Sequence, residues 1–173
     1  MNRIPTSSEC IELLIKAGCS NSVIEHCKAV RDYAVRIAEK AGADVELVNA
    51  GALLHDIGRA KTHNINHVLE GVRIAKKFGL SEKVIRIIER HVGAGITSEE
   101  AEKLGLPPNN YIPVSLEEKI VCHADNLIQR GRKQSVEKEV RKALRKGNKE
   151  FATRLIDLHK ELSNICGIDV IDI

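Results

Sequence analysis

Apolar residues recur along most of this chain at steps of three and four positions, which is the spacing of one face of an α-helix. In the stretch that begins at Val23, for example, Val30, Ala34 and Ile37 continue this spacing as far as Ala41. The strict alternation of apolar and polar residues that is typical of β-strands is nearly absent. The pattern therefore predicts an all-α fold, a compact bundle of several helices.

Capping residues and glycines divide the pattern into separate helices. Ser, Thr, Asp or Asn before an apolar run favours a helix start, and Gly after it favours a helix end. The helices predicted in this way run from Thr6, Ser7 or Ser8 to Lys16, from Ser20, Asn21 or Ser22 to about Lys40, over about 45–56, from His67 to about Phe78, from Ser81 to about His91, from Ser98 to Gly105, from Ser115 to about Gln129, and over about 149–164.

Composition places the chain among ordinary globular proteins. Its 173 residues fit one domain, 43% of them are hydrophobic, and only 2% are aromatic. The core must then be built from Leu, Ile, Val and Ala, which suits packed helices. No apolar run reaches the length of a membrane span, and the first residues lack the apolar core of a signal peptide. We therefore expect a cytoplasmic protein with no membrane partner.

Cysteine usage and charge narrow the function classes. The five cysteines are scattered, with no Cys-x-x-Cys pair, so reduced buried thiols are expected rather than disulfides or a zinc knuckle. A net charge of +3 is too small to indicate nucleic acid as a partner, although it is compatible with a small anionic substrate. The basic residues between Lys133 and Lys149 could bind a polyanion, but a solvated helical surface is the simpler interpretation.

The stretch Gly51-Ala-Leu-Leu-His55-Asp56-Ile-Gly58-Arg59 carries the first chemical signal. It places an imidazole and a carboxylate side by side at the end of an apolar helix, and both suit a divalent transition metal. Gly58 lets the chain turn away. Arg59 could face the same cavity as Asp56, or it could be a surface cation at a helix C-terminus.

Further metal-ligand residues stand in or beside the other helices. His26 lies in an apolar row, where an isolated histidine would be a hydrogen-bonded core residue. His91 ends a predicted helix, where it could be a terminal cation. Asp125 lies among apolar residues, and a carboxylate in such a setting is costly unless it is paired or bound to metal. His67 begins the helix that precedes Gly71.

This order of residues resembles the HD-domain metal-dependent phosphohydrolases. The resemblance covers roughly residues 20–132, and residues 133–173 would form a C-terminal helical extension of one HD domain over 1–173. It is carried by three pieces of sequence and the early His26: His55-Asp-Ile-Gly-Arg59, His67-Val-Leu-Glu-Gly71-Val-Arg-Ile-Ala75, and Glu118-Lys-Ile-Val-Cys-His-Ala-Asp125. Neither His63 nor His123 occupies a ligand position of the family.

The resemblance implies a site for one or two divalent ions, which could be Fe, Mn, Co, Ni, Zn or Mg. The implied metal ligands are His26, His55, Asp56 and Asp125 for the first ion, and His67 and His91 for a second ion bridged by Asp56. The implied reaction is attack by a metal-bound hydroxide on a phosphoryl group. Asp56, Arg59 and Arg132 are the candidate catalytic residues, the two arginines because guanidinium matches phosphate oxygens.

Within the family, the pattern is closest to the dinuclear hydrolases that cut diadenosine tetraphosphate symmetrically. This favours a phosphoanhydride or phosphodiester substrate, a nucleotide or another small phosphate ester. The alternatives are a nucleoside 5′-monophosphate phosphatase and a non-catalytic nucleotide-binding metal protein. Cyclic-di-GMP phosphodiesterases are disfavoured because no Gly-Tyr-Pro motif follows His91.

Overall fold

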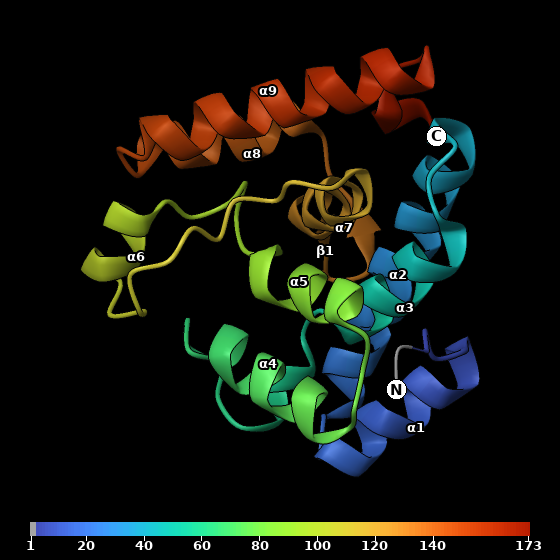
Figure 1. The fold of residues 1–173 in the computed structure, drawn as a ribbon. Helices are drawn as coiled ribbons and strands as arrows, with labels where there is room; N and C mark the ends of the chain where they lie inside the picture. The colour runs from blue at the N-terminus through green and yellow to red at the C-terminus, as the bar shows by residue number, and fades with distance from the viewer. Residues whose placement is uncertain (1–2) are drawn as a thin grey trace.

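The computed structural model describes residues 3–173, and nearly all of its regular structure is helical (Figure 1). The elements in chain order are α1 (Ser7–Ala17), α2 (Asn21–Ala41), α3 (Val45–Leu54), the 3₁₀ turn η1 (Ile57–Ala60), α4 (His67–Lys77), α5 (Glu82–Arg90), α6 (Ser98–Lys103), α7 (Leu116–Leu127), β1 (Ile128–Gln129), β2 (Arg132–Lys133), α8 (Val136–Arg145), α9 (Lys149–Cys166) and the 3₁₀ turn η2 (Val170–Asp172). The predicted all-α fold is confirmed.

Most of the predicted helix starts are confirmed by side-chain caps. The side chains of Thr6, Ser20, Asp44 and Ser81 each accept a hydrogen bond from a backbone N–H in the first turn of the helix that follows. These bonds satisfy donors that have no partner within the helix. The sequence therefore determines these starts locally.

Ser115 and Glu118 have the spacing of a capping box, of which only one bond forms. The Ser115 hydroxyl accepts a bond from the Glu118 N–H at 3.2 Å, as predicted. The Glu118 carboxylate does not return to the Ser115 N–H but accepts from the Val114 N–H at 2.8 Å and from Arg90 at 3.0 Å. Glu118 is buried, so its ion pair with Arg90 ties α7 to α5.

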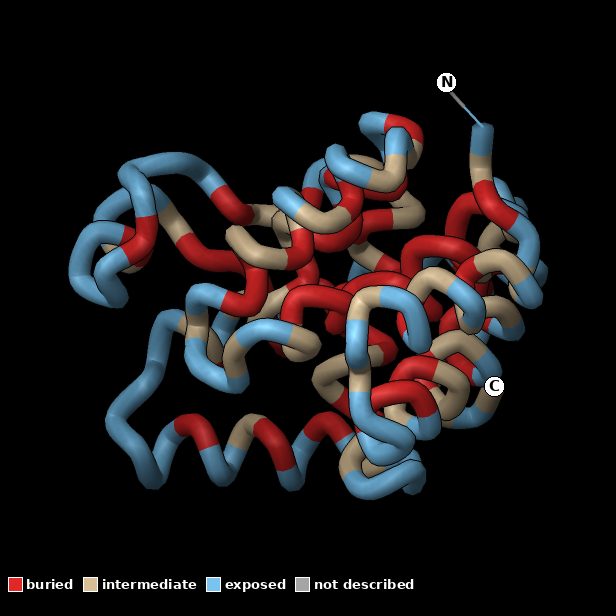
Figure 2. Tube along the Cα trace, turned by 90° about the horizontal axis from the view of Figure 1, so that it is seen from below, coloured by how far each residue is buried: buried red, intermediate tan, exposed pale blue. Residues whose placement is uncertain are grey.

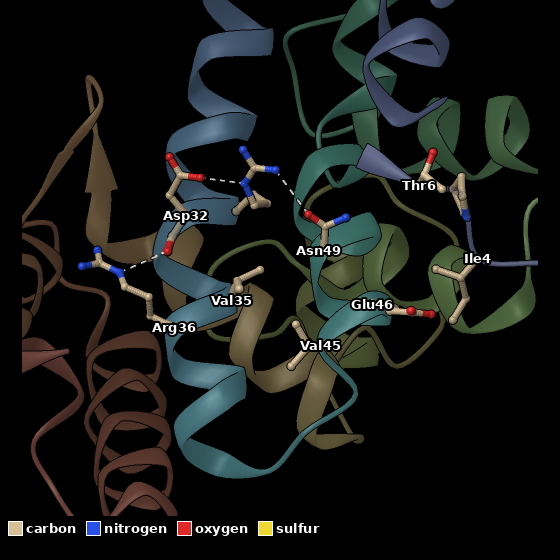
Figure 3. A pocket seen from close by; sticks show the side chains of 10 residues that line it. Ile4, Thr6, Asp32, Val35, Arg36, Val45, Glu46 and Asn49 are labelled. Carbon is tan, nitrogen blue, oxygen red and sulfur yellow. Dashed lines mark hydrogen bonds and ion pairs between the residues drawn. The ribbon is translucent and has the colours of Figure 1, made fainter. Parts of the chain in front are cut away.

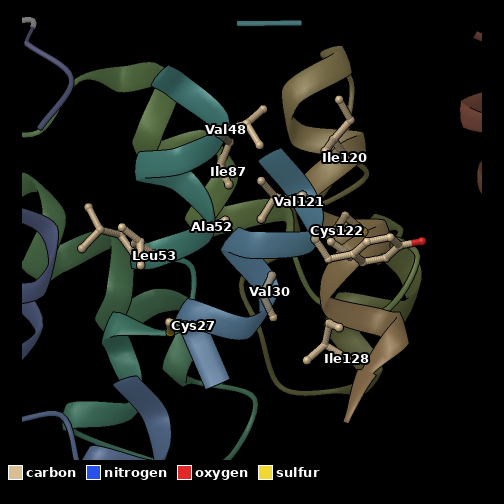
Figure 4. Packing of buried hydrophobic residues seen from close by; sticks show 14 of the residues in the cluster. Cys27, Val30, Val48, Ala52, Leu53, Ile87, Ile120, Val121, Cys122 and Ile128 are labelled. Atoms are coloured by element: carbon tan, nitrogen blue, oxygen red, sulfur yellow. The ribbon is translucent and has the colours of Figure 1, made fainter. Parts of the chain in front are cut away.

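Helix α3 lies at the centre of the bundle. It packs against α1, α2, α5 and α7, and every residue from Leu47 to Leu54 except Asn49 is buried. In Figure 4, Val48, Ala52 and Leu53 of α3 lie among buried side chains of α2, α5 and α7. A helix that is apolar on nearly all sides belongs in a core. Figure 2 shows the same result for the whole chain, with the buried segments gathered in the middle.

Two predicted helices end earlier than expected. Helix α3 stops at Leu54, so His55 is its C-cap and Asp56 lies beyond it, with φ −100° and ψ 15°. Helix α7 stops at Leu127, and β1 then pairs antiparallel with β2. The turn between the strands contains Arg130 and Gly131, both with positive φ, as a tight two-residue hairpin requires.

The C-terminal helices cover one side of the bundle (Figure 1). Helix α8 was not predicted with definite bounds. It packs on α9, and α9 in turn packs on α7 and α2. Leu155 and Leu162 of α9 are buried, as its apolar spacing predicts. Among residues 3–173, no helix is both long enough and apolar enough to cross a membrane.

Candidate metal centre

Side chains from five helices or their ends meet at one place in the bundle. They are the six predicted metal ligands His26 of α2, His55 at the end of α3, Asp56 after it, His67 at the start of α4, His91 at the end of α5, and Asp125 of α7. All except His26 and Asp125 are buried. Ligands far apart in sequence are thus brought together by the packing of α2, α4, α5 and α7 around α3.

The cluster has two overlapping halves. In the first, the Asp125 Oδ1 lies 2.9 Å from the Nε2 of His26 and 3.3 Å from the Nε2 of His55. In the second, the Asp56 Oδ1 lies 3.3 Å from the Nε2 of His67 and 3.4 Å from the Nε2 of His91. Two sets of three potential ligand atoms lie within 4.8 Å of one another and could each hold an ion: His26, His55 and Asp125, and His55, Asp56 and His91.

The two oxygens of Asp56 face different halves of the cluster. While Oδ1 faces His67 and His91, Oδ2 lies 3.7 Å from the Nε2 of His55 and 4.0 Å from that of His26. Oδ2 also accepts a hydrogen bond from the Arg59 Nε at 2.6 Å. This arrangement is what a carboxylate needs in order to contact two ions at once.

Three imidazoles are held in one tautomer by the backbone. In His55, His67 and His91, the Nδ1 lies 2.7 Å from a main-chain carbonyl oxygen three residues earlier, and a carbonyl can only accept. Each Nδ1 therefore carries the proton and donates it, which leaves the Nε2 lone pair directed into the cluster. Metal-binding histidines are oriented by this kind of bond.

The unpaired atoms of the cluster fit a cation. The His55 Nε2 and the Asp56 Oδ1 are buried and have no hydrogen-bond partner. The Nε2 atoms of His67 and His91 lie 3.2 Å apart, and since both Nδ1 atoms are protonated, two lone pairs face each other. Such an arrangement is unfavourable in a buried site unless a positive charge lies near both. The donor set, imidazole and carboxylate, suits a divalent transition metal.

The charge states of the carboxyl groups agree with this fit. Burial raises the pKa of a carboxyl group and is the largest single effect on Asp56 and Asp125, but the imidazoles around them outweigh it. The pKa of Asp56 is held well below its ordinary value, first by the charge of His55, and the pKa of Asp125 is lowered in the same way. Burial lowers the pKa of His55, but the negative charges around it, first that of Asp125, raise it well above its ordinary value, so a metal bound there would displace a proton from this ring. Burial also lowers the pKa of His91. Ionised carboxylates and a neutral imidazole are the forms that bind metal.

Gly58 allows two ligand-bearing segments to approach closely. A Cβ at Gly58 would overlap the carbonyl oxygen of His67, and Gly71 lies just beyond, where its own Cβ would meet the Ile88 side chain. The contact presses η1 against the first turn of α4. Gly58 is thus needed for the close packing that brings His67 beside Asp56. The position of Gly58, two residues after Asp56 in the sequence, did not indicate this role.

We expect Gly58→Ala to destabilise the protein by about 3 kcal/mol, because the added methyl group would push backbone against backbone. This corresponds to a loss of about 5–10 °C in the melting temperature of a chain of this size. Gly71→Ala is the matched control and should cost less, since the nearest contact of its added Cβ is the Ile88 side chain at 2.7 Å rather than backbone. Thermal unfolding of both variants checks the prediction, and an equal or larger loss for Gly71→Ala would contradict it.

The remaining candidate residues have different surroundings. Arg59 belongs to the site, because it bonds Asp56 and, at 3.2 Å, the carbonyl of His63. His63 is exposed on the loop, and buried His123 bonds His159 instead, so neither joins the cluster.

Arg132 is exposed on β2 and, among residues 3–173, no hydrogen bond or ion pair links it to the six ligands. The catalytic role predicted for Arg132 has no support in this geometry.

A large pocket lies elsewhere. It measures about 610 Å³ and is formed by the segment before α1 together with α2 and α3 (Figure 3). Its polar side chains include Asp32 and Arg36, which Figure 3 shows on α2, and Asn49 of α3. None of the six candidate ligands lines it.

Comparison with known proteins agrees with the fold. A family model described as "HD domain" matches residues 23–129. A tRNA (cytidine(56)-2′-O)-methyltransferase of Thermoplasma volcanium is 46% identical over 170 residues, which are 98% of this chain and 50% of the relative. An uncharacterized protein of Methanocaldococcus jannaschii is 46% identical over 159 residues, covering 88% of this chain and 94% of that protein.

A solved structure has a similar fold. It is the HD domain of the L. monocytogenes phosphodiesterase PgpH in complex with cyclic-di-AMP. The TM-score is 0.58 and the sequence identity is 16%, and the match covers 91% of this chain and 96% of that one. The fold, the clustered histidines and aspartates, and the matched family model define a helical HD domain with side chains that could hold a metal ion. The chain belongs to the HD-domain family. It spans half the length of the methyltransferase relative.

Proposed function

We propose that the chain is a metal-dependent phosphohydrolase that cleaves a phosphodiester or phosphoanhydride bond of a nucleotide. The observation that carries the proposal is Asp56, whose two oxygens face the two halves of a histidine cluster. A carboxylate in this position suits a bridge between two ions. His26, His55 and Asp125 would complete one ion's ligands, and His67 and His91 the other's.

A divalent ion bound here would act as a Lewis acid on a phosphoryl oxygen and lower the pKa of coordinated water. The protein's own groups prepare the site for that chemistry. The main chain fixes three imidazoles, and the ionised carboxylates supply negative charge. Because the ligands are buried and held from several helices, little rearrangement is needed when the substrate binds.

Arg59 has two roles in the proposal. Its Nε holds the Asp56 carboxylate at 2.6 Å, and its Nη1 bonds the His63 carbonyl. Its Nη2 has no hydrogen-bond partner among residues 3–173, so it is available for a substrate phosphate. A guanidinium matches phosphate oxygens well. Arg132 is left out of the proposed machinery.

The kind of nucleotide is suggested by the compared proteins. The structural neighbour PgpH was solved with cyclic-di-AMP, and the methyltransferase relative is named for an activity on tRNA. Cyclic or linear dinucleotides and RNA therefore both belong among the substrates to be tested, together with dinucleoside polyphosphates. RNA is included here although the small net charge of the chain did not indicate nucleic acid as a partner.

A second candidate function is a non-catalytic domain that binds RNA or a nucleotide through the same metal site. The half-length match to a tRNA methyltransferase favours it, because this domain is joined there to a second segment of similar length. Turnover separates the two candidates. The nucleoside 5′-monophosphate phosphatase alternative differs in needing only the first half of the cluster.

Metal removal tests the proposed function. Protein purified without chelator should retain divalent metal and hydrolyse at least one of a linear dinucleotide, a dinucleoside polyphosphate, a nucleoside monophosphate or an RNA oligomer. Dialysis against a chelator should abolish the activity and, if the metal is present at about 100 times its Kd, remove about 2.7 kcal/mol of stability. Activity should return when Mn²⁺ is added. Bound metal without turnover on any substrate would favour the non-catalytic candidate.

A further inference from the structure

We propose that the groove between the loop after α5, helix α6 and the start of α9 binds the nucleobase next to the phosphate that is cleaved. The inference rests on the proposed function and deepens it. The groove measures about 320 Å³, which is within the usual range for sites of small molecules. A purine or pyrimidine with part of its ribose fits a space of this size.

The groove is lined by residues that are near neighbours in the chain of two candidate metal ligands. One wall contains Val92, which follows His91 in the chain, and Ile65, which precedes His67 by two positions. Consecutive Cα atoms are about 3.8 Å apart, so the backbone of this wall lies close to the backbone of two candidate ligands of the second half. Asn126, next to Asp125, donates to the Gly93 carbonyl at 2.6 Å and so fixes the loop to the ligand-bearing helix α7.

The opposite wall supplies an aromatic surface. Phe151, in the first turn of α9, is half-buried and lines the groove. A Cβ at Gly93 would lie 3.3 Å from the Phe151 ring, so the missing side chain lets the ring rest against the loop. Together with Ile65, Val92 and the half-exposed Leu104, Phe151 gives the groove an apolar lining that includes one aromatic ring. Such a surface favours a planar base, since every base presents a π-face.

Polar groups at the edge of the groove can orient a base. Arg154 is held by the Gly95 carbonyl at 3.1 Å and by Glu100 at 2.9 Å, which makes this end rigid. Its Nε is buried without a hydrogen-bond partner. The Asn148 Oδ1 caps α9 by accepting from the Phe151 N–H, so its amide Nδ2 is the group left to bond a base edge.

One side of the groove is built by a part of the chain outside the matched family region. Asn148, Phe151 and Arg154 all lie beyond residue 129, where the HD-domain match ends. The metal ligands are all within that match. The helical extension thus supplies a recognition wall for a reaction whose chemistry belongs to the family region.

Binding measurements on the Mn²⁺-loaded full chain test the inference. The probes are adenosine 5′-monophosphate and ribose 5-phosphate, which differ only in the base, and calorimetry measures the Kd of each. Phe151→Leu should weaken adenosine monophosphate binding about tenfold, within the range known for base–aromatic stacking, and leave ribose 5-phosphate binding unchanged. Phe78→Leu, at the chain's other half-buried phenylalanine, is the matched control and should change neither.

The outcomes separate this inference from the proposed function. An equal loss for ribose 5-phosphate, or an unchanged Kd for adenosine monophosphate, would overturn the base groove even if the protein hydrolyses nucleotides. A base-dependent loss in a protein that hydrolyses none of the substrates would support the groove while the hydrolase proposal fails. If Phe151→Leu does not fold, Leu104→Ser on the surface replaces it, and severalfold weaker binding of the monophosphate alone is expected.

Discussion

Asp56→Ala should abolish metal retention and lower kcat/KM for nucleotide hydrolysis by at least about 1,000-fold, equivalent to about 4 kcal/mol of transition-state stabilisation. Asp56 is the one residue whose carboxylate faces both halves of the cluster, and it also holds Arg59. Its loss removes a ligand from each half. The helices should still form, because Asp56 lies between α3 and η1 and caps neither with its side chain.

Elemental analysis, circular dichroism and hydrolysis assays on the same preparation check this prediction. Asp32→Ala is the control, because Asp32 is an exposed carboxylate of α2 that pairs with Arg31 away from the cluster. It should retain metal and activity. Metal bound at wild-type stoichiometry in Asp56→Ala would show that the ligands are assigned wrongly.

Replacing His67 and His91 together with alanine should remove one of two ions and lower kcat by at least about 100-fold, with a smaller change in KM. Both imidazoles face the same oxygen of Asp56 and each other, whereas His26, His55 and Asp125 form a group that contains neither of them. Two ions act on the attacking and leaving oxygens together, so loss of one affects the transition state more than substrate binding.

Metal stoichiometry and steady-state kinetics on dinucleotide and nucleoside monophosphate substrates measure the effect. His63→Ala serves as the control, since His63 is an exposed loop histidine near the site. A wild-type protein with one ion, and a double variant with unchanged turnover, would rule out the dinuclear mechanism and favour the monophosphatase.

The helices were predictable because their signals are local. A serine or threonine before an apolar run caps its own helix, as Thr6 and Ser20 do, and no distant contact is needed. The hairpin of β1 and β2 was not predictable from alternation, because each strand has two residues and β2 is exposed. Gly131, shortly after the predicted helix end at about Gln129, was the available signal for a turn.

The residue types of the candidate site could be predicted from the sequence, but the hydrogen bonds and the helix packing that position them could not. The order of His26, the His55-Asp56 doublet and Asp125 indicates a shared pocket through family resemblance. The bonds from the Nδ1 atoms to main-chain carbonyls depend on where the helices end, and those ends are shifted by one or two residues from the predicted ones. The contribution of Phe151 depends on how α9 packs against a distant loop, which no local pattern reports.

The close contact between Gly58 and the start of α4 also restricts motion. Two backbone segments that touch without side chains between them cannot slide past each other, so η1 and the first turn of α4 must move as one unit. Amide protons in these segments should exchange with solvent at similar, slow rates. Any opening that admits the proposed substrate must then occur on the other side of the proposed base-binding groove. There, α6 and the first turn of α9 carry exposed residues and have fewer buried neighbours.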